Sequence, residues 1–200
     1  WFAGCHKKPR PPPGKSVSAI PGLNPPLAPE AMDRICFLFN HDQVHQIAHS
    51  LPIALAMAER HPGQVTLAVT TSKTEQHVRS IAGPAVGKCE LVRLGLGTAL
   101  SRGLEAALGE LVPARKLLVY RDNLDFFRQF GALVVSEKTS LLLKTRYGLD
   151  RLRIIHTRHG AGDRAIGFGK ESARFDLVLV AGPKIARRLA QRASVAPERI

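Results

Sequence analysis

The residues best suited to chemistry lie close together in the stretch RIIHTRHGAGDR, at positions 153–164. Its first half is apolar enough for a strand, and titratable side chains and glycines follow where that strand would end. The imidazole of His159 titrates near neutrality and suits a general base, and the guanidinium groups of Arg158 and Arg164 suit phosphate oxygens. Gly160 lets the backbone approach a ligand closely. We therefore expect His159 to be catalytic and Arg158, Gly160 and Arg164 to bind substrate.

The same stretch contains a second histidine, His156, for which we expect a structural role. Strand alternation places the side chains of His156 and His159 on opposite faces, so only His159 is presented at the strand end. The alternative interpretation of His159 is a loop histidine whose hydrogen bonds pin the turn.

A second polar cluster follows the apolar run RICFLFN at positions 34–40. His41, Asp42 and His45 come directly after it, and we expect these three side chains to contact a polar ligand. His41, His45 and His49 have the spacing of one helix face. Because no further Cys or His completes a tetrahedral shell, we expect no metal site.

A third candidate precedes the helical pattern PKIARRL at positions 183–189. Gly182 stands at the cap position, and Pro183 suits the first helical position. A helix N-terminus favours an anion, and Lys184 adds a positive charge. We therefore expect Gly182 and Lys184 to bind substrate, although a proline at this position is also ordinary helix punctuation.

The elements that would position these residues alternate between strands and helices. Nearly continuous apolar runs predict strands buried on both faces, and they occur at 34–40, 64–71, 89–95, 132–137, 153–158 and 176–181. Helical periodicity separates them, at 45–63, 72–83, 98–112, 116–130 and 140–148. This alternation predicts an α/β fold, a Rossmann-like parallel sheet with helices on both faces.

Local signals refine this prediction. Ser72 and Glu75 have the spacing of a capping box, and Gly83 marks the end of that helix. Neither a phosphate loop nor a GxGxxG motif follows the first strand. The lone GxG at Gly95 and Gly97 indicates a turn rather than a dinucleotide site, so we expect no bound cofactor.

Composition limits the partners. The net charge of +13 is spread along the chain and suits an anionic partner. The aromatic residues lie in apolar runs rather than among the basic ones, which argues against nucleic-acid binding. Three unpaired cysteines indicate reduced thiols, and no apolar run reaches the length of a membrane span. We expect a cytoplasmic protein, with a disordered, proline-rich basic tail at 1–31 and one domain at 32–200.

The stretch IIHTRHGAGDRAIGF, with RFDLVLVAGPKIARRL after it, resembles the end of the N-terminal half of the CDP-glycerol glycerophosphotransferase family. In that family a strand runs into a Q-T-W-H-G-T type motif, followed by a turn containing Gly or Phe, a strand with an Asp, and a helix. The matching positions here are Thr157, His159, Gly160, Gly167, Phe168, Asp176 and Gly182. Arg158 replaces the family's aromatic residue, and Ala161-Gly162 replaces Thr-Pro, which leaves the acceptor open.

The resemblance implies the acceptor-side domain of a GT-B transferase that builds teichoic-acid type polymers. The resemblance implies that His159 corresponds to the catalytic base of that family. It also implies that the contacts to the donor lie mainly in a C-terminal domain that is absent from these 200 residues. The implied partners are a nucleotide-activated donor, CDP-glycerol or a nucleotide sugar, and an anionic or lipid-linked acceptor. An anionic membrane face is a further candidate partner for so basic a domain.

Two alternatives remain open. The first is a GT-B glycosyltransferase or sugar-nucleotide epimerase that uses a UDP-sugar. The second is a non-catalytic basic module that binds nucleic acid. This alternative would require aromatic stacking residues among the basic ones, and the sequence does not show them.

Overall fold

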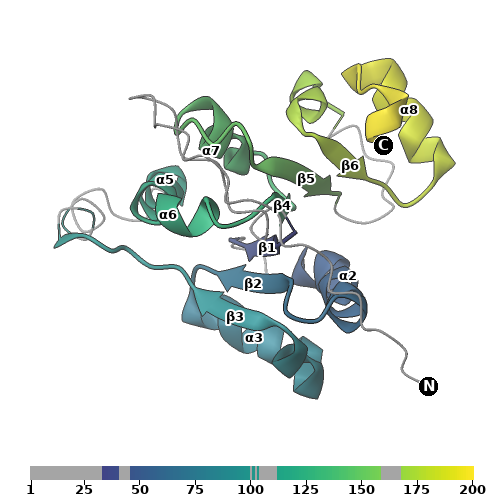
Figure 1. The fold of residues 1–200 in the computed structure, drawn as a ribbon. Helices are drawn as coiled ribbons and strands as arrows, with labels where there is room; N and C mark the ends of the chain where they lie inside the picture. Colours follow the sequence, from purple (N-terminus) through teal and green to yellow (C-terminus); the bar gives the residue numbers. More distant parts are fainter. Residues whose placement is uncertain (1–32, 41–45, 100, 102, 104–111, 159–167) are drawn as a thin grey trace, which may run out of the picture.

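The computed structural model describes residues 33–40, 46–99, 101, 103, 112–158 and 168–200. Its strands form one six-stranded sheet in the order β3-β2-β1-β4-β5-β6, and all five strand pairs are parallel (Figure 1). In chain order the strands are β1 (Ile35–Phe39), β2 (Val65–Val69), β3 (Glu90–Arg93), β4 (Ala132–Val135), β5 (Arg153–Thr157) and β6 (Leu177–Leu179). The predicted α/β, Rossmann-like parallel sheet is confirmed, and each predicted strand range contains one of these strands.

Helices connect the strands. The α-helices are α2 (Ile47–Arg60), α3 (Ser72–Ala82), α5 (Val112–Asp122), α6 (Leu124–Phe127), α7 (Leu142–Thr145) and α8 (Pro183–Ala193). Short 3₁₀ helices are η2 (Gly83–Lys88), η3 (Thr139–Leu141), η4 (Lys170–Arg174) and η5 (Pro197–Arg199). The helix predicted over 98–112 falls mostly outside the described residues.

Each face of the sheet packs into its own core. In the central strand β1, Phe37 and Phe39 face a core shared with α2 and α3. Cys36 and Leu38 face the other core, which α5, α6, α7 and α8 complete. Figure 1 shows α2 and α3 on the lower side of the sheet and α5, α6 and α7 on the upper side. Burial on both faces is the reason why β1 is apolar at successive positions.

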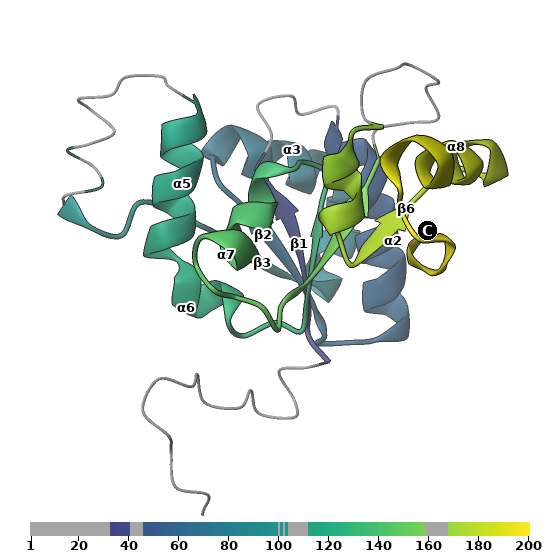
Figure 2. The ribbon, with the colours of Figure 1, turned by 90° about the horizontal axis from the view of Figure 1, so that it is seen from above.

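The strand order reverses between β1 and β4. From β1 the chain proceeds outward through β2 to β3, then returns to the other side of β1 and continues through β4 and β5 to β6. In open parallel sheets, ligands bind at the carboxyl ends of the strands, next to such a reversal. In Figure 2 the arrow of β1 points to the upper side of the view, so the carboxyl edge lies there.

One capping prediction is wrong. The N-cap of α3 is Thr71, whose hydroxyl accepts a hydrogen bond from the Thr74 amide at 3.1 Å. Glu75 binds Arg79 one turn later instead of closing a capping box with Ser72. The end of α3 at Gly83, with φ of 54°, is as predicted.

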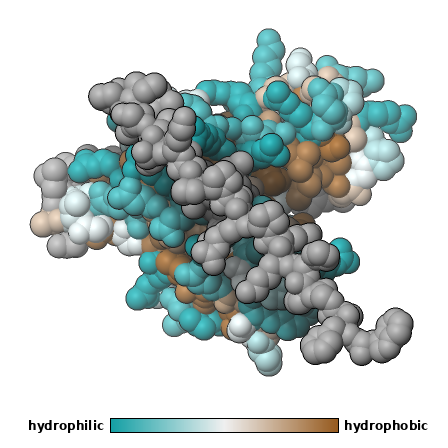
Figure 3. Space-filling model, viewed as in Figure 1, coloured by the Kyte–Doolittle hydropathy of each residue, from teal (hydrophilic) through white to brown (hydrophobic). Residues whose placement is uncertain are grey.

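Hydrophilic side chains cover much of the face shown in Figure 3. In Figure 3 hydrophilic side chains gather at the upper right, where α8 lies in Figure 1, around a hydrophobic patch. Cys36 is buried, Cys89 is half-buried, and both are free thiols. Within the described part of the chain, no helix is both long and apolar enough to cross a bilayer.

Candidate functional site

Three residues stand in one row across the carboxyl edge of the sheet. Phe37 of β1 faces Val134 of β4, so continuing that register by three residues sets Asn40 beside Glu137. Val135 of β4 faces His156 of β5, so continuing this second register by two residues sets Glu137 beside Arg158. Asn40, Glu137 and Arg158 therefore follow three neighbouring strands at the same level. This row lies at the point where the strand order reverses.

Asn40 and Glu137 are joined in a buried hydrogen-bond network with Tyr120 of α5. The Asn40 amide nitrogen donates to Tyr120 Oη at 2.6 Å and to Glu137 Oε1 at 2.8 Å. Tyr120 Oη donates to the same carboxylate oxygen at 2.7 Å, and Ser140 Oγ does so at 3.0 Å. Thr139 donates to the second oxygen, Oε2. Glu137 is thus the hub that ties the ends of β1 and β4 to the helix above them.

The network keeps Glu137 ionised. Burial raises the pKa of this carboxyl, but the hydrogen bonds from Thr139, Asn40 and Tyr120 and the charge of Lys116 outweigh burial, and the pKa lies below its ordinary value. The Lys116 ammonium lies 3.8 Å from Glu137 Oε2. Tyr120 responds in the opposite direction, because burial and the adjacent carboxylate raise its pKa well above the ordinary value.

Next to this network, two arginines converge on the ring of Phe168. The Cζ atoms of Arg158 and Arg188 lie 4.2 and 4.4 Å from the ring centroid. Cation–π attraction holds each guanidinium group on the ring, whereas the two like charges repel each other. Partial burial and then the charge of Arg188 lower the pKa of Arg158. A phosphate in contact with both groups would relieve this repulsion through charge-assisted hydrogen bonds.

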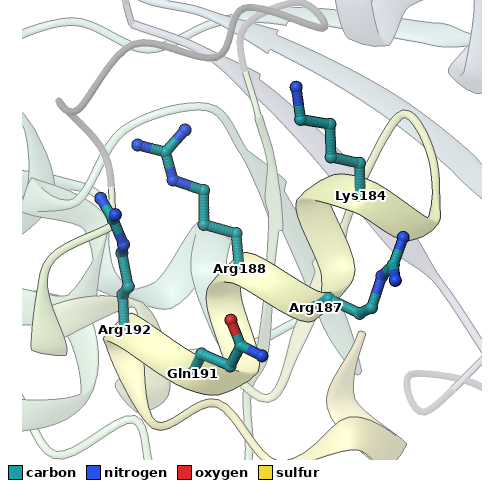
Figure 4. A pocket seen from close by; sticks show the side chains of 5 residues that line it. All are labelled: Lys184, Arg187, Arg188, Gln191 and Arg192. Atoms are coloured by element: carbon teal, nitrogen blue, oxygen red, sulfur yellow. The ribbon is translucent and has the colours of Figure 1, made fainter.

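The first three turns of α8 extend this positive charge. Lys184, Arg187, Arg188, Gln191 and Arg192 line a shallow hollow of about 300 Å³ on the outer face of the helix. Figure 4 shows the side chains of Lys184, Arg188 and Arg192 projecting to the same side. The opposite face of α8 buries Ile185, Leu189 and Ala193 in the core. The amphipathic spacing of α8 therefore displays four cations on one surface.

The structure brings together part of the predicted site. Lys184 and Arg158 are linked through Arg188, which shares the hollow with Lys184 and the aromatic ring with Arg158. Gly182 caps α8 ahead of Pro183, as predicted. Six further predicted site residues lie outside the described residues: His41, Asp42, His45, His159, Gly160 and Arg164. The described residues directly before two of them, Asn40 and Arg158, lie at the same sheet edge.

His156 has the structural environment expected for it. It is buried within β5, and its ring stacks on Phe175 with centroids 4.5 Å apart and planes at 11°. Such packing accounts for the residue without a role in chemistry.

Of the two weaker motifs, the GxG segment has a structural contact, whereas His41 and His45 of the histidine motif lie outside the described residues. The amides of Gly97 and Thr98 donate to Asp122 Oδ2 at 3.0 and 3.2 Å, so the irregular GxG segment is held by the end of α5. His49 is exposed on α2. Among the described residues, no group of three or more His, Cys, Asp or Glu side chains could hold a metal ion.

Sequence reasoning missed the residues at the centre of this edge. Asn40, Tyr120 and Glu137 come together only through the fold, and no local motif marks them. The sequence gives only a weak indication of Arg188, which follows Lys184 by one helical turn and therefore lies on the same helix face.

Comparison with known proteins assigns this chain to no family. No protein-family model matches the chain, and no curated protein matches it. The crystal structure of Anabaena Alr3699/HepE in complex with UDP and glucose is similar, with a TM-score of 0.48 and 10% sequence identity. The similarity covers 81% of this chain and 42% of that chain, so this chain spans less than half of its length. This similarity identifies no functional residue. The described residues define the class of the domain as α/β and Rossmann-like.

Proposed function

We propose that this domain is the acceptor-side half of a GT-B transferase that moves a glycerophosphate, or a similar nucleotide-activated group, to a hydroxyl of a lipid-linked surface-polymer precursor. The observation that carries the proposal is the convergence of Arg158 and Arg188 on Phe168 at the carboxyl edge of the sheet. Two like charges held together there favour a phosphate-bearing substrate. CDP-glycerol as the donor rests on the resemblance of the stretch around His159 to glycerophosphotransferases.

In the proposed reaction His159 removes the proton from the acceptor hydroxyl. The freed oxygen forms a bond to the phosphorus that carries the glycerol, the bond from that phosphorus to the bridging oxygen breaks, and CMP leaves. The negative charge on the phosphate oxygens is stabilised by Arg158, Arg164 and Lys184. Arg158 directly precedes His159 in the chain. His159 later returns its proton to solvent.

The basic outer face of α8 suits an acceptor that is itself anionic. Arg187 and Arg192 are exposed residues of the hollow, and together with Lys184 and Arg188 they carry more positive charge than one phosphate group needs. Each Lys or Arg near an anionic membrane surface contributes about 1 kcal/mol of attraction. The proposal therefore includes an acceptor presented at the cytoplasmic face of a membrane.

The decisive experiment is a transfer assay with the intact enzyme, comparing CDP-glycerol with UDP-glucose as donors. The proposal predicts acceptor-dependent release of CMP. It also predicts that His159→Ala lowers kcat by roughly 10²- to 10⁴-fold, the usual contribution of a positioned base, with little change in donor binding.

His156→Ala is the matched control in that assay. Because His156 packs on Phe175, its loss should reduce turnover only in proportion to lost folded protein, measured by thermal unfolding. Near-normal turnover in His159→Ala would contradict the role of His159 as the base. Acceptor-dependent release of UDP, without release of CMP, would replace glycerophosphate transfer by glycosyl transfer.

A further inference from the structure

A buried acceptor atom at the carboxyl edge lacks a hydrogen-bond donor among the described residues. Asn40 is only 3% exposed, and its Oδ1 atom has no partner there. Buried polar atoms without partners are rare in folded proteins, because such an atom has lost its water without compensation. Its position, directly after β1 and beside β4, is where ligands bind in this kind of sheet.

The orientation of the Asn40 amide follows from its neighbours. An ionised carboxylate only accepts hydrogen bonds, so the group that faces Glu137 Oε1 at 2.8 Å has to be the amide nitrogen. The same nitrogen faces Tyr120 Oη at 2.6 Å. Both partners lie on the nitrogen side of the amide group, so the oxygen is turned away from them. The network therefore holds Oδ1 in a fixed direction.

The chemistry of a partner for this oxygen is constrained. The ligand group that binds Asn40 Oδ1 has to be a hydrogen-bond donor. The surroundings favour a neutral donor, because the charge of Glu137 is already balanced by Lys116 and by several hydroxyl and amide donors. A cationic ligand group would need a carboxylate whose lone pairs are still free, and those of Glu137 are already engaged. A hydroxyl group of the ligand fits this position better.

The hydroxyl position and the arginine pair are at a suitable separation. Asn40 and Arg158 follow strands that are two places apart in the sheet and lie on the same row. With neighbouring strands about 4.8 Å apart, their backbones are separated by roughly 10 Å. A small polyol phosphate, with a hydrogen bond at each end, spans such a distance. Both side chains also point to the sheet face on which Tyr120 and Phe168 lie.

We infer that Asn40 Oδ1 binds a hydroxyl group of a polyol phosphate whose phosphate lies at Arg158 and Arg188, with Glu137 and Tyr120 as positioning residues for the Asn40 amide. This subsite rests on the phosphate-binding role given to the two arginines under the proposed function. It adds a determinant that selects hydroxyl-bearing ligands over other phosphate monoesters.

The test compares two probes with the full chain, glycerol 3-phosphate and propyl phosphate. They carry the same charge and the same number of carbon atoms, and only the first has hydroxyl groups. We expect glycerol 3-phosphate to bind about three- to tenfold more tightly in a calorimetric or NMR titration, the contribution of one neutral hydrogen bond. The side-chain amide signals of Asn40 should shift with glycerol 3-phosphate and stay in place with propyl phosphate.

Two variants assign the preference to Asn40. Asn40→Ala should remove it, so that both probes bind with the affinity of propyl phosphate. Ser140→Ala is the matched control, because it also deletes one donor to Glu137 Oε1, at 3.0 Å, without touching Asn40 Oδ1, and it should keep the preference.

The outcomes separate this inference from the proposed function. Equal binding of the two probes to the wild-type chain, or a preference retained in Asn40→Ala, overturns the hydroxyl subsite and leaves the phosphate site standing. Failure of both probes to bind overturns both. If Asn40→Ala does not fold, the amide signals of Asn40 in the wild-type chain decide, and unshifted signals overturn the inference.

Discussion

Arginine and phenylalanine side chains are in contact at both the amino edge and the carboxyl edge of the sheet, but in different arrangements. At the amino edge Arg34 lies over the ring of Phe130, with its Cζ atom 5.1 Å from the centroid, and its Nη2 atom is 2.6 Å from Glu90 Oε2. At the carboxyl edge the ring of Phe168 holds the guanidinium groups of both Arg158 and Arg188. The first arrangement pairs a cation with a carboxylate, and the second brings two cations together.

This difference separates a structural contact from a candidate binding site. Arg34 and Glu90, together with Thr66, connect the beginnings of β1, β2 and β3, and their charges cancel. Arg158 and Arg188 carry like charges on one aromatic ring, and a bound anion would reduce the repulsion between these two groups. The buried carboxylate of Glu137 belongs to the same edge but already has many donors.

The largest expected difference between the two edges is the loss of folding stability when one carboxylate is removed from each edge. Glu137→Ala should destabilise the fold by about 3–5 kcal/mol, since it leaves the buried partners Asn40 and Tyr120 and the Lys116 charge without their hub. Glu90→Ala removes an exposed pair and should cost less than about 1 kcal/mol. Chemical unfolding of both variants measures this contrast. Similar losses in the two variants would show that the Glu137 network does not hold the carboxyl edge together.

The pH dependence of stability should identify the same carboxylate. Because the folded protein holds the pKa of Glu137 below its ordinary value, ionisation of Glu137 stabilises the fold above the unfolded pKa of about 4.3. That contribution is lost as the pH falls from there through the folded pKa. Glu137→Gln should therefore flatten the acid side of a plot of unfolding free energy against pH. An unchanged acid limb would assign the acid sensitivity to other carboxylates.

The smallest expected effect concerns the arginines themselves. Arg188→Gln removes the repulsion from Arg158 together with the cation–π attraction to Phe168, so the two effects offset and stability should change by no more than a few tenths of a kcal/mol. Arg34→Gln breaks an ion pair and should destabilise the fold by up to about 1 kcal/mol. Thermal unfolding at low salt compares the two. A larger loss for Arg188→Gln than for Arg34→Gln would make the Phe168 cluster a structural element.

The sequence predicted the sheet well because its strands carry a local signal. Buried parallel strands need apolar residues at successive positions, as in β1, and helices of 3.6-residue period separate them. The N-cap of α3 was mispredicted by one residue, since Thr71 and Ser72 are both good caps and only the fold selects between them.

The candidate site was less predictable because it depends on contacts between distant positions. Arg158 and Lys184 were identified from their place at a strand end and a helix start. Asn40 and Glu137 are separated by 97 positions along the chain, and only the parallel pairing of β1 and β4 brings them together. In the sequence, Arg188 resembles any solvent-facing arginine of an amphipathic helix.

The central claim is that the carboxyl edge binds phosphate through Arg158 and Arg188. The most direct measurement is a titration of the chain with a simple phosphate monoester, propyl phosphate, at low ionic strength. Arg188→Gln should weaken binding by about tenfold or more, because a charge-assisted hydrogen bond contributes about 1.5–3 kcal/mol. The charge-matched control Arg60→Gln, in the last turn of α2, should leave the affinity unchanged. Equal weakening by both substitutions, or no effect of Arg188→Gln, would contradict a specific phosphate site at this edge.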